Sequence, residues 1–373
     1  MSRRSRLKFA LRLILWLPAV VLCLLTLMSA YGGMVDPRRC VLFAMAAMAF
    51  PLTAALLGLA MAVYAVLRRR MVTDVCALTL VACLPAYALY SPYHPGGTDT
   101  QEERVFTVMN YNAYGYKPLL SSMEVPSPNP TVQCIINSGA DIVCLQETVE
   151  AHYNLGRKGI TQEQVDSLQS LYPYGKTFRD MSVYSKYPLE ESRIVSFFTR
   201  KSDVELGSYI LFYKVDFHGV PINVLAVYLS SVGLMDDDKE LYETLAEGKV
   251  RHSGVRRGGK RLLEKFAEAA RSRAMQADSL CAVADSIGGN VIICGDFNDI
   301  PGCYADRVLR RAGFTDAYAA AGNGAGISYR NNRFWFRIDH VFCRGNLRPL
   351  RSRVVREGIS DHYPVVTSFA VGK

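Results

Sequence analysis

Three long apolar runs occupy the N-terminal part of the chain. Residues 13–31, 40–67 and 75–93 contain no charged side chain. Each run is long enough to cross the ~30 Å hydrocarbon core of a bilayer as a helix. The pattern therefore predicts three transmembrane helices that form a membrane anchor over residues 1–93. An alternative interpretation of the first run is a cleavable signal peptide, because basic residues precede it.

The pattern changes after residue 93. Residues 94–101 are rich in Pro, Gly and Thr and predict a linker. Short apolar runs then interleave with helical patterns over residues 102–373, which is typical of an α/β domain with two packed sheets or one large sheet. The predicted strands are 105–111, 141–145, 210–217, 222–228, 291–294, 338–342 and 364–369. The predicted helices are 130–138, 161–171 and 260–287.

The positive charge of the chain belongs to its N-terminal part. The formal net charge is +9, from 43 basic and 34 acidic side chains. Residues 1–98 hold 10 of the basic and 2 of the acidic side chains, which leaves 33 and 32 for the rest. A domain that holds nucleic acid through a strong positive field usually carries that charge itself. The near-neutral balance after residue 98 argues against such a domain.

The loops between the apolar runs predict an orientation. Basic residues are concentrated before residue 13 and at 68–70, whereas the loop between the first two runs has only Arg38 and Arg39 beside Asp36. Basic loops stay on the cytoplasmic side of a membrane. The N-terminus is therefore expected to be cytoplasmic, and three crossings place the α/β domain on the periplasmic or extracytoplasmic side.

Polar side chains follow several of the predicted strands. In ICGDFND, residues 293–299, carboxylates and an amide come directly after an apolar run. Side chains at the carboxyl ends of strands lie where α/β sheets bind ligands. An ordinary turn is the alternative interpretation, since Gly, Asp and Asn are common turn residues. The candidates are Asn112, Glu147, Tyr228, Asp296, Asn298, Asp339, Asp361 and His362.

Five motifs in one order resemble the endonuclease/exonuclease/phosphatase superfamily, which includes deoxyribonucleases, abasic-site endonucleases, inositol-polyphosphate phosphatases and neutral sphingomyelinases. They are VMNYNAYG, DIVCLQET, GDFND, RIDHVF and ISDHYPV, within residues 105–369. The resemblance implies a four-layer αββα sandwich whose strand ends meet in one pocket. Many members have His-Leu where this chain has Tyr228-Leu229. Abasic-site endonucleases are similar to it there, so we expect the phenol to bind the phosphate.

The chemistry of phosphoester hydrolysis calls for a hard metal ion. Charge develops on the attacking and leaving oxygens beside an already anionic phosphoryl group. Mg²⁺ or Mn²⁺ can neutralise that charge, and both prefer oxygen ligands. We therefore expect Glu147 to bind the metal, with Asp361 facing it and Asn112 orienting its coordination shell.

The remaining candidates have proton-transfer and phosphate-binding chemistry. Asp296 is expected to hold or deprotonate the attacking water. His362 is expected to donate to a phosphoryl oxygen while Asp339 holds its imidazole in the charged form. Asn298 is a neutral donor that can orient the phosphate without repelling it.

The sequence thus predicts a membrane-anchored, Mg²⁺-dependent phosphoesterase. Nucleic acid and a phospholipid or inositol headgroup both stay open as substrates, and the lipid bilayer is a partner through the anchor. Residues 247–265 are rich in Lys, Arg and Gly and form either a solvated approach to a helix or a contact for an anionic substrate. The alternative function is a catalytically inactive binding or scaffold protein, which would have lost Glu147, Asp296 or His362. All three are present.

Overall fold

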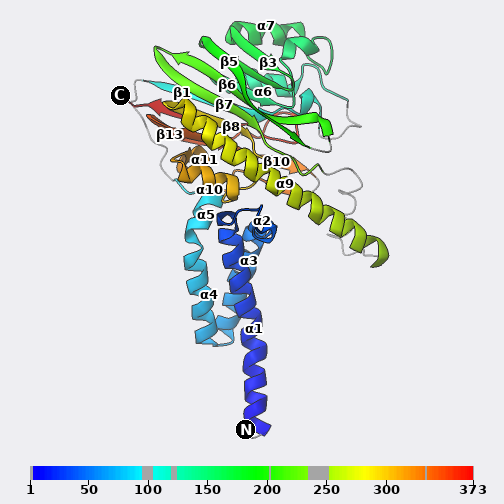
Figure 1. The fold of residues 1–373 in the computed structure, drawn as a ribbon, viewed down its shortest axis with the longest axis vertical. Helices are drawn as coiled ribbons and strands as arrows, with labels where there is room; N and C mark the ends of the chain where they lie inside the picture. The colour runs from blue at the N-terminus through cyan, green and yellow to red at the C-terminus, as the bar shows by residue number, and fades with distance from the viewer. Residues whose placement is uncertain are drawn as a thin grey trace.

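Two six-stranded sheets stack face to face above a bundle of apolar helices in the computed structural model (Figure 1). The structure describes residues 3–94, 104–118, 124–200, 203–233, 252–331 and 334–372. Most of the predicted linker and residues 247–251 of the basic stretch lie outside these ranges.

The first sheet has the strand order β13-β14-β1-β2-β4-β3, with β1 and β2 as a parallel pair at its centre. Helices α6 (Pro130–Ser138) and α7 (Gln162–Leu171) pack on its outer face. The strands are β1 Val105–Asn112, β2 Ile142–Gln146, β3 Tyr174–Phe178, β4 Met181–Ser185, β13 Leu347–Val354 and β14 Val365–Val371.

The second sheet has the order β5-β6-β7-β8-β12-β9, with β7 and β8 parallel. Helices α9 (His252–Ile287) and α10 (Tyr304–Arg311) cover its outer face. The strands are β5 Leu189–Arg200, β6 Asp203–Phe217, β7 Val220–Tyr228, β8 Asn290–Asp296, β9 Thr315–Asp316 and β12 Asp339–Arg344. A short helix, α11 (Ala317–Ala321), and a hairpin of β10 (Tyr329–Asn331) and β11 (Phe334–Phe336) complete the sandwich.

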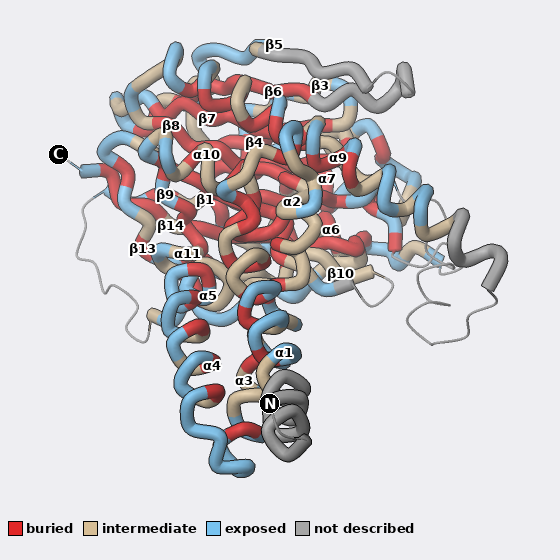
Figure 2. The backbone as a smooth tube through the Cα atoms, turned by 60° about the horizontal axis from the view of Figure 1, so that its bottom comes forward, coloured by how far each residue is buried: buried red, intermediate tan, exposed pale blue. Residues whose placement is uncertain are grey.

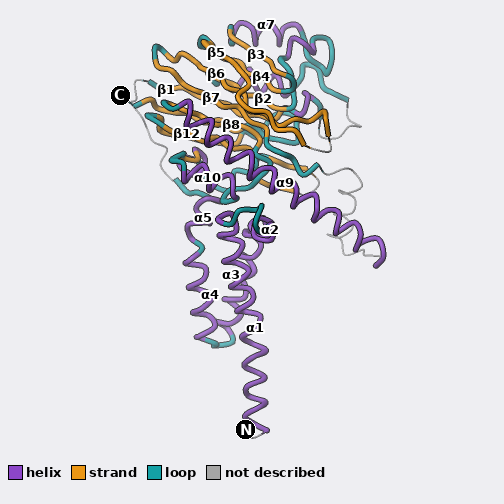
Figure 3. The backbone as a smooth tube through the Cα atoms, viewed as in Figure 1, coloured by secondary structure: helices purple, strands orange, loops and turns teal. Residues whose placement is uncertain are grey.

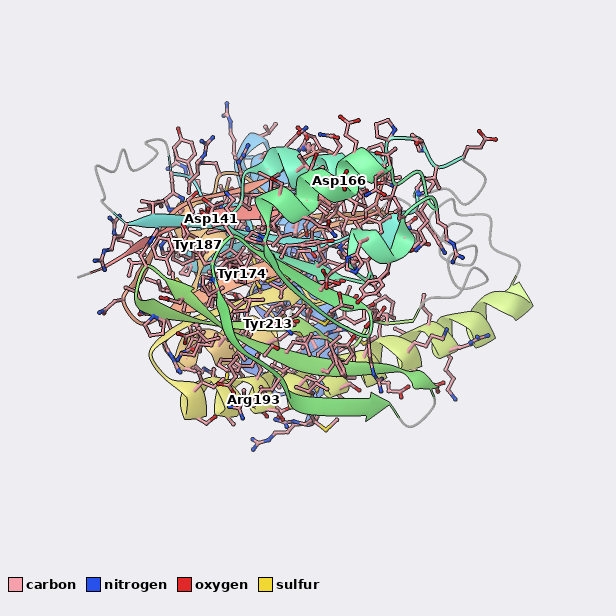
Figure 4. The ribbon with its side chains drawn as sticks, turned by 90° about the horizontal axis from the view of Figure 1, so that it is seen from above. Asp141, Asp166, Tyr174, Tyr187, Arg193 and Tyr213 are labelled. Carbon is pink, nitrogen blue, oxygen red and sulfur yellow. The ribbon has the colours of Figure 1, made fainter. Side chains whose placement is uncertain are left out.

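Both faces of the central strands are buried. In β8, Ile292 and Cys294 lie in the core between the sheets, whereas Val291 and Ile293 lie in the core beneath α9 and α10. Helices therefore cover the outside of both sheets (Figure 3), and Figure 4 shows Asp166 of α7 and Arg193 of β5 on opposite sides of the sandwich. Strands buried on both faces have nearly continuous apolar sequences. The predicted α/β sandwich with two sheets is confirmed.

The strands that the sequence pattern missed lie mostly toward the sheet edges. β3, β5 and β13 are edge strands, and β4 is next to an edge. β13 contains Pro349 and three arginines, and its pairing with β14 shifts register between Pro349 and Arg351. Proline and positive charge are common on edge strands because the outer hydrogen-bonding edge faces solvent. Such strands lack the apolar runs that revealed β1, β2, β7 and β8.

The predicted membrane helices are partly broken. The stretch Trp16–Met34 is long and apolar enough to cross a membrane. It begins in α1 (Arg3–Tyr31) and ends in the turn that follows this helix. The second and third apolar runs each form a bent pair, α2 (Val41–Met48) with α3 (Phe50–Val66) and α4 (Arg70–Ala82) with α5 (Leu84–Tyr90), bent by 65° and 51°. Each pair qualifies as a span only if it is counted as one. Three spans therefore stay a prediction.

Proline explains where the two pairs break. α3 and α5 each have a proline in their first turn, Pro51 and Pro85. Proline lacks a backbone N–H and fits the first turn of a helix, but it interrupts the hydrogen bonding of a helix that continues through it.

Many apolar side chains on the outside of the bundle are exposed, including Leu59, Val66 and Leu78, and Figure 2 shows α4 largely exposed.

The bundle is joined to the sandwich by close contacts. The Arg38 Nη2 atom lies 2.6 Å from Asp278 Oδ2 of α9, and Arg307 of α10 donates to the Ala30 carbonyl oxygen over 3.2 Å. Gly33 lies against the backbone of residues 302–303, so closely that a Cβ atom there would overlap the Gly302 carbonyl oxygen. The position of the bundle is therefore set by packing as well as by charge.

This packing predicts that Gly33→Ala loosens the junction. The added methyl group has to push residues 302–303 away, and overpacking of this kind costs about 1–3 kcal/mol. We expect faster hydrogen–deuterium exchange in α10 of the full-length protein in detergent. Gly58→Ala is the matched control, because no atom lies within 4 Å of the Cβ position at Gly58. Equal exchange in the two variants would contradict this description of the junction.

Candidate active site at the strand ends

Strand register brings most of the predicted site residues together. β1 and β2 run parallel with Asn112 beside Gln146, so Glu147 follows directly after the end of β2. In the second sheet, Tyr228 pairs with Asp296, and Asp296 pairs with Asp339 on its other side. Parallel strands end at the same edge of a sheet. The residues at the ends of β1 and β2 therefore meet those at the ends of β7 and β8, where the two sheets face each other.

Two of these residues have an uncommon backbone conformation. Glu147 has a φ of 55° and Asn298 a φ of 49°. Residues other than glycine rarely adopt this left-handed region, and it is found at sites where the surrounding structure fixes the backbone. The Glu147 carbonyl oxygen accepts a hydrogen bond from Gly115 N over 2.9 Å, which helps to hold that turn.

Asn112 connects the two sheets through its side-chain amide. Its Nδ2 atom donates to Glu147 Oε1 over 2.9 Å and to Asp296 Oδ2 over 3.1 Å, and its Oδ1 atom accepts from Tyr114 N. The side chain is completely buried. The amide thus holds two carboxylates side by side, and the predicted role of Asn112 in orienting the coordination shell of a metal ion stays a prediction.

Tyr228 also holds Glu147. Its hydroxyl donates to Glu147 Oε1 over 2.9 Å. Burial, together with the Glu147 charge, raises the pKa of Tyr228 well above its usual value, so the phenol is a neutral donor. The predicted contact between this phenol and a phosphate stays a prediction; in this structure the hydroxyl fixes a carboxylate.

His362 lies between two carboxylates. Its Nδ1 atom is 2.8 Å from Asp339 Oδ2, and its Nε2 atom is 3.7 Å from Asp296 Oδ2. Burial alone would lower the pKa of His362, but the charges of Asp339 and Asp296 outweigh burial and raise it. The imidazole is therefore positively charged, and both of its nitrogens are donors.

Asp296 is placed to bind water or a metal ion. Burial raises its pKa above the usual value, while the charge of His362 opposes that shift. The backbone N–H of Asn298 donates to Asp296 Oδ1 over 2.8 Å, and the Asn298 side chain donates to the Leu229 carbonyl oxygen. Asn298 thereby fixes the turn after β8.

One cavity joins these residues. Its polar lining residues include Glu147, Asp296, Asn298, Asp361 and His362. Asp361 is buried, and burial raises its pKa. Its apolar lining residues are Met48, Val232, Phe266, Ile300, Phe336 and Ile338.

The donor atoms around the cavity fit a hard divalent cation. Among the described lining residues, the carboxylates are Glu147, Asp296, Asp299 and Asp361, against the positive charges of Arg273 and His362. Arg273 is already paired with Asp299 at 3.2 Å. Carboxylate oxygens are the ligands that Mg²⁺ and Mn²⁺ prefer. The excess negative charge therefore suits such an ion near Glu147.

A second group of possible ligands is less suited to Mg²⁺. Asp296, Asp339 and His362 have ligand atoms within 4.8 Å of one another. However, the Nδ1 atom of His362 is already hydrogen-bonded to Asp339, and imidazole is a poor ligand for Mg²⁺. The geometry of this group suits proton handling better than metal binding.

Several residues support the site. Arg273 and Gln276 bind the Ser230 backbone and side chain, and buried His340 binds the Asp299 carbonyl oxygen. Ser360 was not among the predicted residues; its hydroxyl donates to the Asn112 carbonyl oxygen and accepts from His362 N. Its position directly before Asp361 in ISDH was the available signal. Met48 gave no signal, because it belongs to an apolar run far away in the sequence.

Comparisons with solved structures give the same fold at low identity. An endonuclease/exonuclease/phosphatase from Beutenbergia cavernae is 18% identical, with a TM-score of 0.50 over 72% of each chain. A protein of the same description from Bacteroides vulgatus is 14% identical, with a TM-score of 0.49 over 72% of this chain and all of that one. TDP2 of D. rerio, complexed with a single-strand DNA product, is 14% identical, with a TM-score of 0.46 over 71% and 98% of the two chains.

Family models divide the chain in two. Residues 12–90 match the model of a domain of unknown function. Comparison of the chain with curated proteins gives no match. Residues 109–362 match the model of the Endonuclease/Exonuclease/phosphatase family, and they contain every candidate site residue. The chain therefore belongs to the endonuclease/exonuclease/phosphatase family, whose members are phosphoester hydrolases.

Proposed function

We propose that this protein is a membrane-anchored, Mg²⁺- or Mn²⁺-dependent phosphodiesterase. Residues 102–373 are its catalytic domain, and residues 1–93 are its anchor. The observation that carries the proposal is the pair of carboxylates, Glu147 and Asp296, that Asn112 bridges beside the Asp339–His362 pair. A phosphodiester of nucleic acid or of a lipid headgroup is the substrate.

Glu147 and Asp361 would hold the metal ion. When bound, the ion supplies positive charge that neutralises the phosphoryl group as its negative charge grows. Asn112 and Tyr228 both donate to Glu147 Oε1. Two donors on one oxygen fix the carboxylate, so its orientation does not depend on the ion.

Asp296 and His362 would handle the proton and the phosphate. Asp296 lies at the end of β8, and both of its carboxylate oxygens are hydrogen-bonded. This position suits it to orient a water molecule and to accept a proton from it. His362, charged and held by Asp339, donates to a phosphoryl oxygen from Nε2. Asn298 fixes the turn that carries Asp296.

The arrangement of helices supports a three-span anchor. α1 begins at the end of the bundle far from the sandwich, and α5 ends beside the sandwich (Figure 1). An odd number of crossings between them is consistent with a cytoplasmic N-terminus and an extracytoplasmic catalytic domain, as the basic loops predict. A reporter that is active only in the cytoplasm, fused after Lys373, tests this orientation. Activity of that reporter would refute it.

Glu147→Gln should raise the Mg²⁺ concentration needed for activity and lower turnover together. The substitution removes negative charge from the ligand while it keeps the shape of the side chain. Hydrolysis of bis(p-nitrophenyl) phosphate across a range of Mg²⁺ concentrations measures both the metal requirement and the turnover. Glu150→Gln is the control, because Glu150 lies three residues away and outside the described cavity lining. An unchanged metal requirement would remove Glu147 from the metal site.

Tyr228→Phe should weaken metal binding about 10- to 100-fold, the usual effect of losing a residue that orients a ligand. Saturating Mg²⁺ should then restore most of the turnover. Tyr213→Phe, measured in the same assay, controls for packing, because it removes only the hydroxyl of a buried tyrosine in the core between the sheets. A loss that high Mg²⁺ does not repair would instead support the phosphate contact expected from the sequence.

Asp296→Asn and His362→Ala should each lower turnover about 10²- to 10⁴-fold, the range for general acid or base catalysis. The double variant should be little worse than the poorer single variant, because residues of one catalytic unit lose their joint benefit together. Turnover is measured on the best phosphodiester, with circular dichroism as the folding control. Fully multiplicative losses would show that the two residues act in separate steps.

A further inference from the structure

Part of the lining of the active-site cavity is apolar and has no role in the chemistry proposed above. Its side chains are Met48, Val232, Phe266, Ile300, Phe336 and Ile338. Four of these six are aliphatic, and all six line the same cavity as the carboxylates. A cavity lined by both charged and apolar side chains suits a molecule that has a charged group and a hydrocarbon part.

Met48 comes from the membrane bundle. It is the last residue of α2, and it packs against the same apolar cluster as Ile300 and Ile338 of the sandwich. α2 contacts α9, which contributes Phe266 to the wall. The bundle therefore supplies part of the cavity lining.

Exposed apolar side chains occur near the cavity-lining residues of the bundle and of α9 in the sequence. Leu42 of α2 is 58% exposed, and Leu52 of α3 is 62% exposed, on either side of Met48 in the sequence. On α9, Leu263 is 58% exposed one helical turn before Phe266. Exposed apolar side chains thus lie near the cavity on both the bundle and the sandwich.

We propose that the apolar side chains of the cavity form a subsite for the hydrocarbon part of a bilayer phospholipid. This inference rests on the proposed phosphodiesterase function and selects its substrate class. The headgroup phosphate would lie beside Glu147 and His362, and the acyl region would contact Met48, Phe266 and Phe336. Each methylene buried in such a wall adds roughly fourfold to affinity.

The lining is poorly suited to nucleic acid. A polyanion is usually held by several basic side chains along its backbone. Within the described lining, the positive side chains are Arg273, which pairs with Asp299 at 3.2 Å, and His362, which belongs to the catalytic group. Met48, Ile300 and Ile338 offer hydrocarbon contacts and cannot stack on bases, whereas the aromatic rings of Phe266 and Phe336 can contact either kind of ligand.

The experiment uses the full-length protein reconstituted in phosphatidylcholine liposomes with Mg²⁺. Phosphatidylcholine, phosphatidylglycerol and phosphatidylinositol are compared with their deacylated glycerophosphodiesters, with bis(p-nitrophenyl) phosphate and with a single-stranded oligonucleotide. Met48→Gln and Phe266→Gln place a polar group in the wall. Met71→Gln is the matched control, because Met71 is 71% exposed at the start of α4 and outside the described cavity lining.

We expect the best diacyl lipid to be cleaved faster than its deacylated form and faster than the oligonucleotide. Met48→Gln and Phe266→Gln should lower kcat/KM for that lipid about tenfold more than for bis(p-nitrophenyl) phosphate, within the range for hydrophobic specificity pockets. Met71→Gln should leave this ratio unchanged.

The possible failures are distinguishable. If the protein hydrolyses bis(p-nitrophenyl) phosphate but prefers the oligonucleotide or the deacylated diesters, or if the two variants leave the ratio unchanged, the lipid subsite is wrong and the phosphodiesterase stands. If no phosphodiester is hydrolysed with Mg²⁺ or Mn²⁺, the proposed function fails and the subsite fails with it.

Discussion

The amide of Asn112 is the interaction on which the site depends. It donates to Glu147, which follows the first sheet, and to Asp296, which ends a strand of the second. Two carboxylates this close repel each other, and a neutral group with two N–H donors offsets that repulsion without adding charge. Neither sheet could build this pair alone. The geometry of the candidate site is therefore a consequence of how the two sheets stack.

The rest of the site is arranged around that bridge. Tyr228 donates to the same oxygen of Glu147, and His362 approaches the same oxygen of Asp296 at 3.7 Å. The left-handed backbone of Glu147 costs on the order of 1–3 kcal/mol, and such a cost is sustained where the surrounding contacts fix the residue. Hydrogen bonds to its side chain and its carbonyl oxygen provide that fixation.

The sequence revealed the parts of the structure that are buried on both sides. β1, β2, β7 and β8 have largely apolar sequences, and the polar residues at their ends meet as expected. Edge strands such as β13 were missed because solvent faces one of their edges and their composition is mixed. The breaks in the apolar helices lie just before Pro51 and Pro85, whose effect depends on tertiary context that a sequence does not contain.

Contact between the bundle and the sandwich could not be predicted, since it joins residues far apart in the chain. Arg38 binds Asp278 and Gly33 packs on residues 302–303, so the bundle holds the sandwich in one orientation. A tether that only kept the enzyme near a membrane would need no such fit. Because Met48 of the bundle lies in the wall of the cavity, a change in the bundle alters the lining of the candidate site. The bundle and the lining of the candidate site are therefore coupled through the same contact surface.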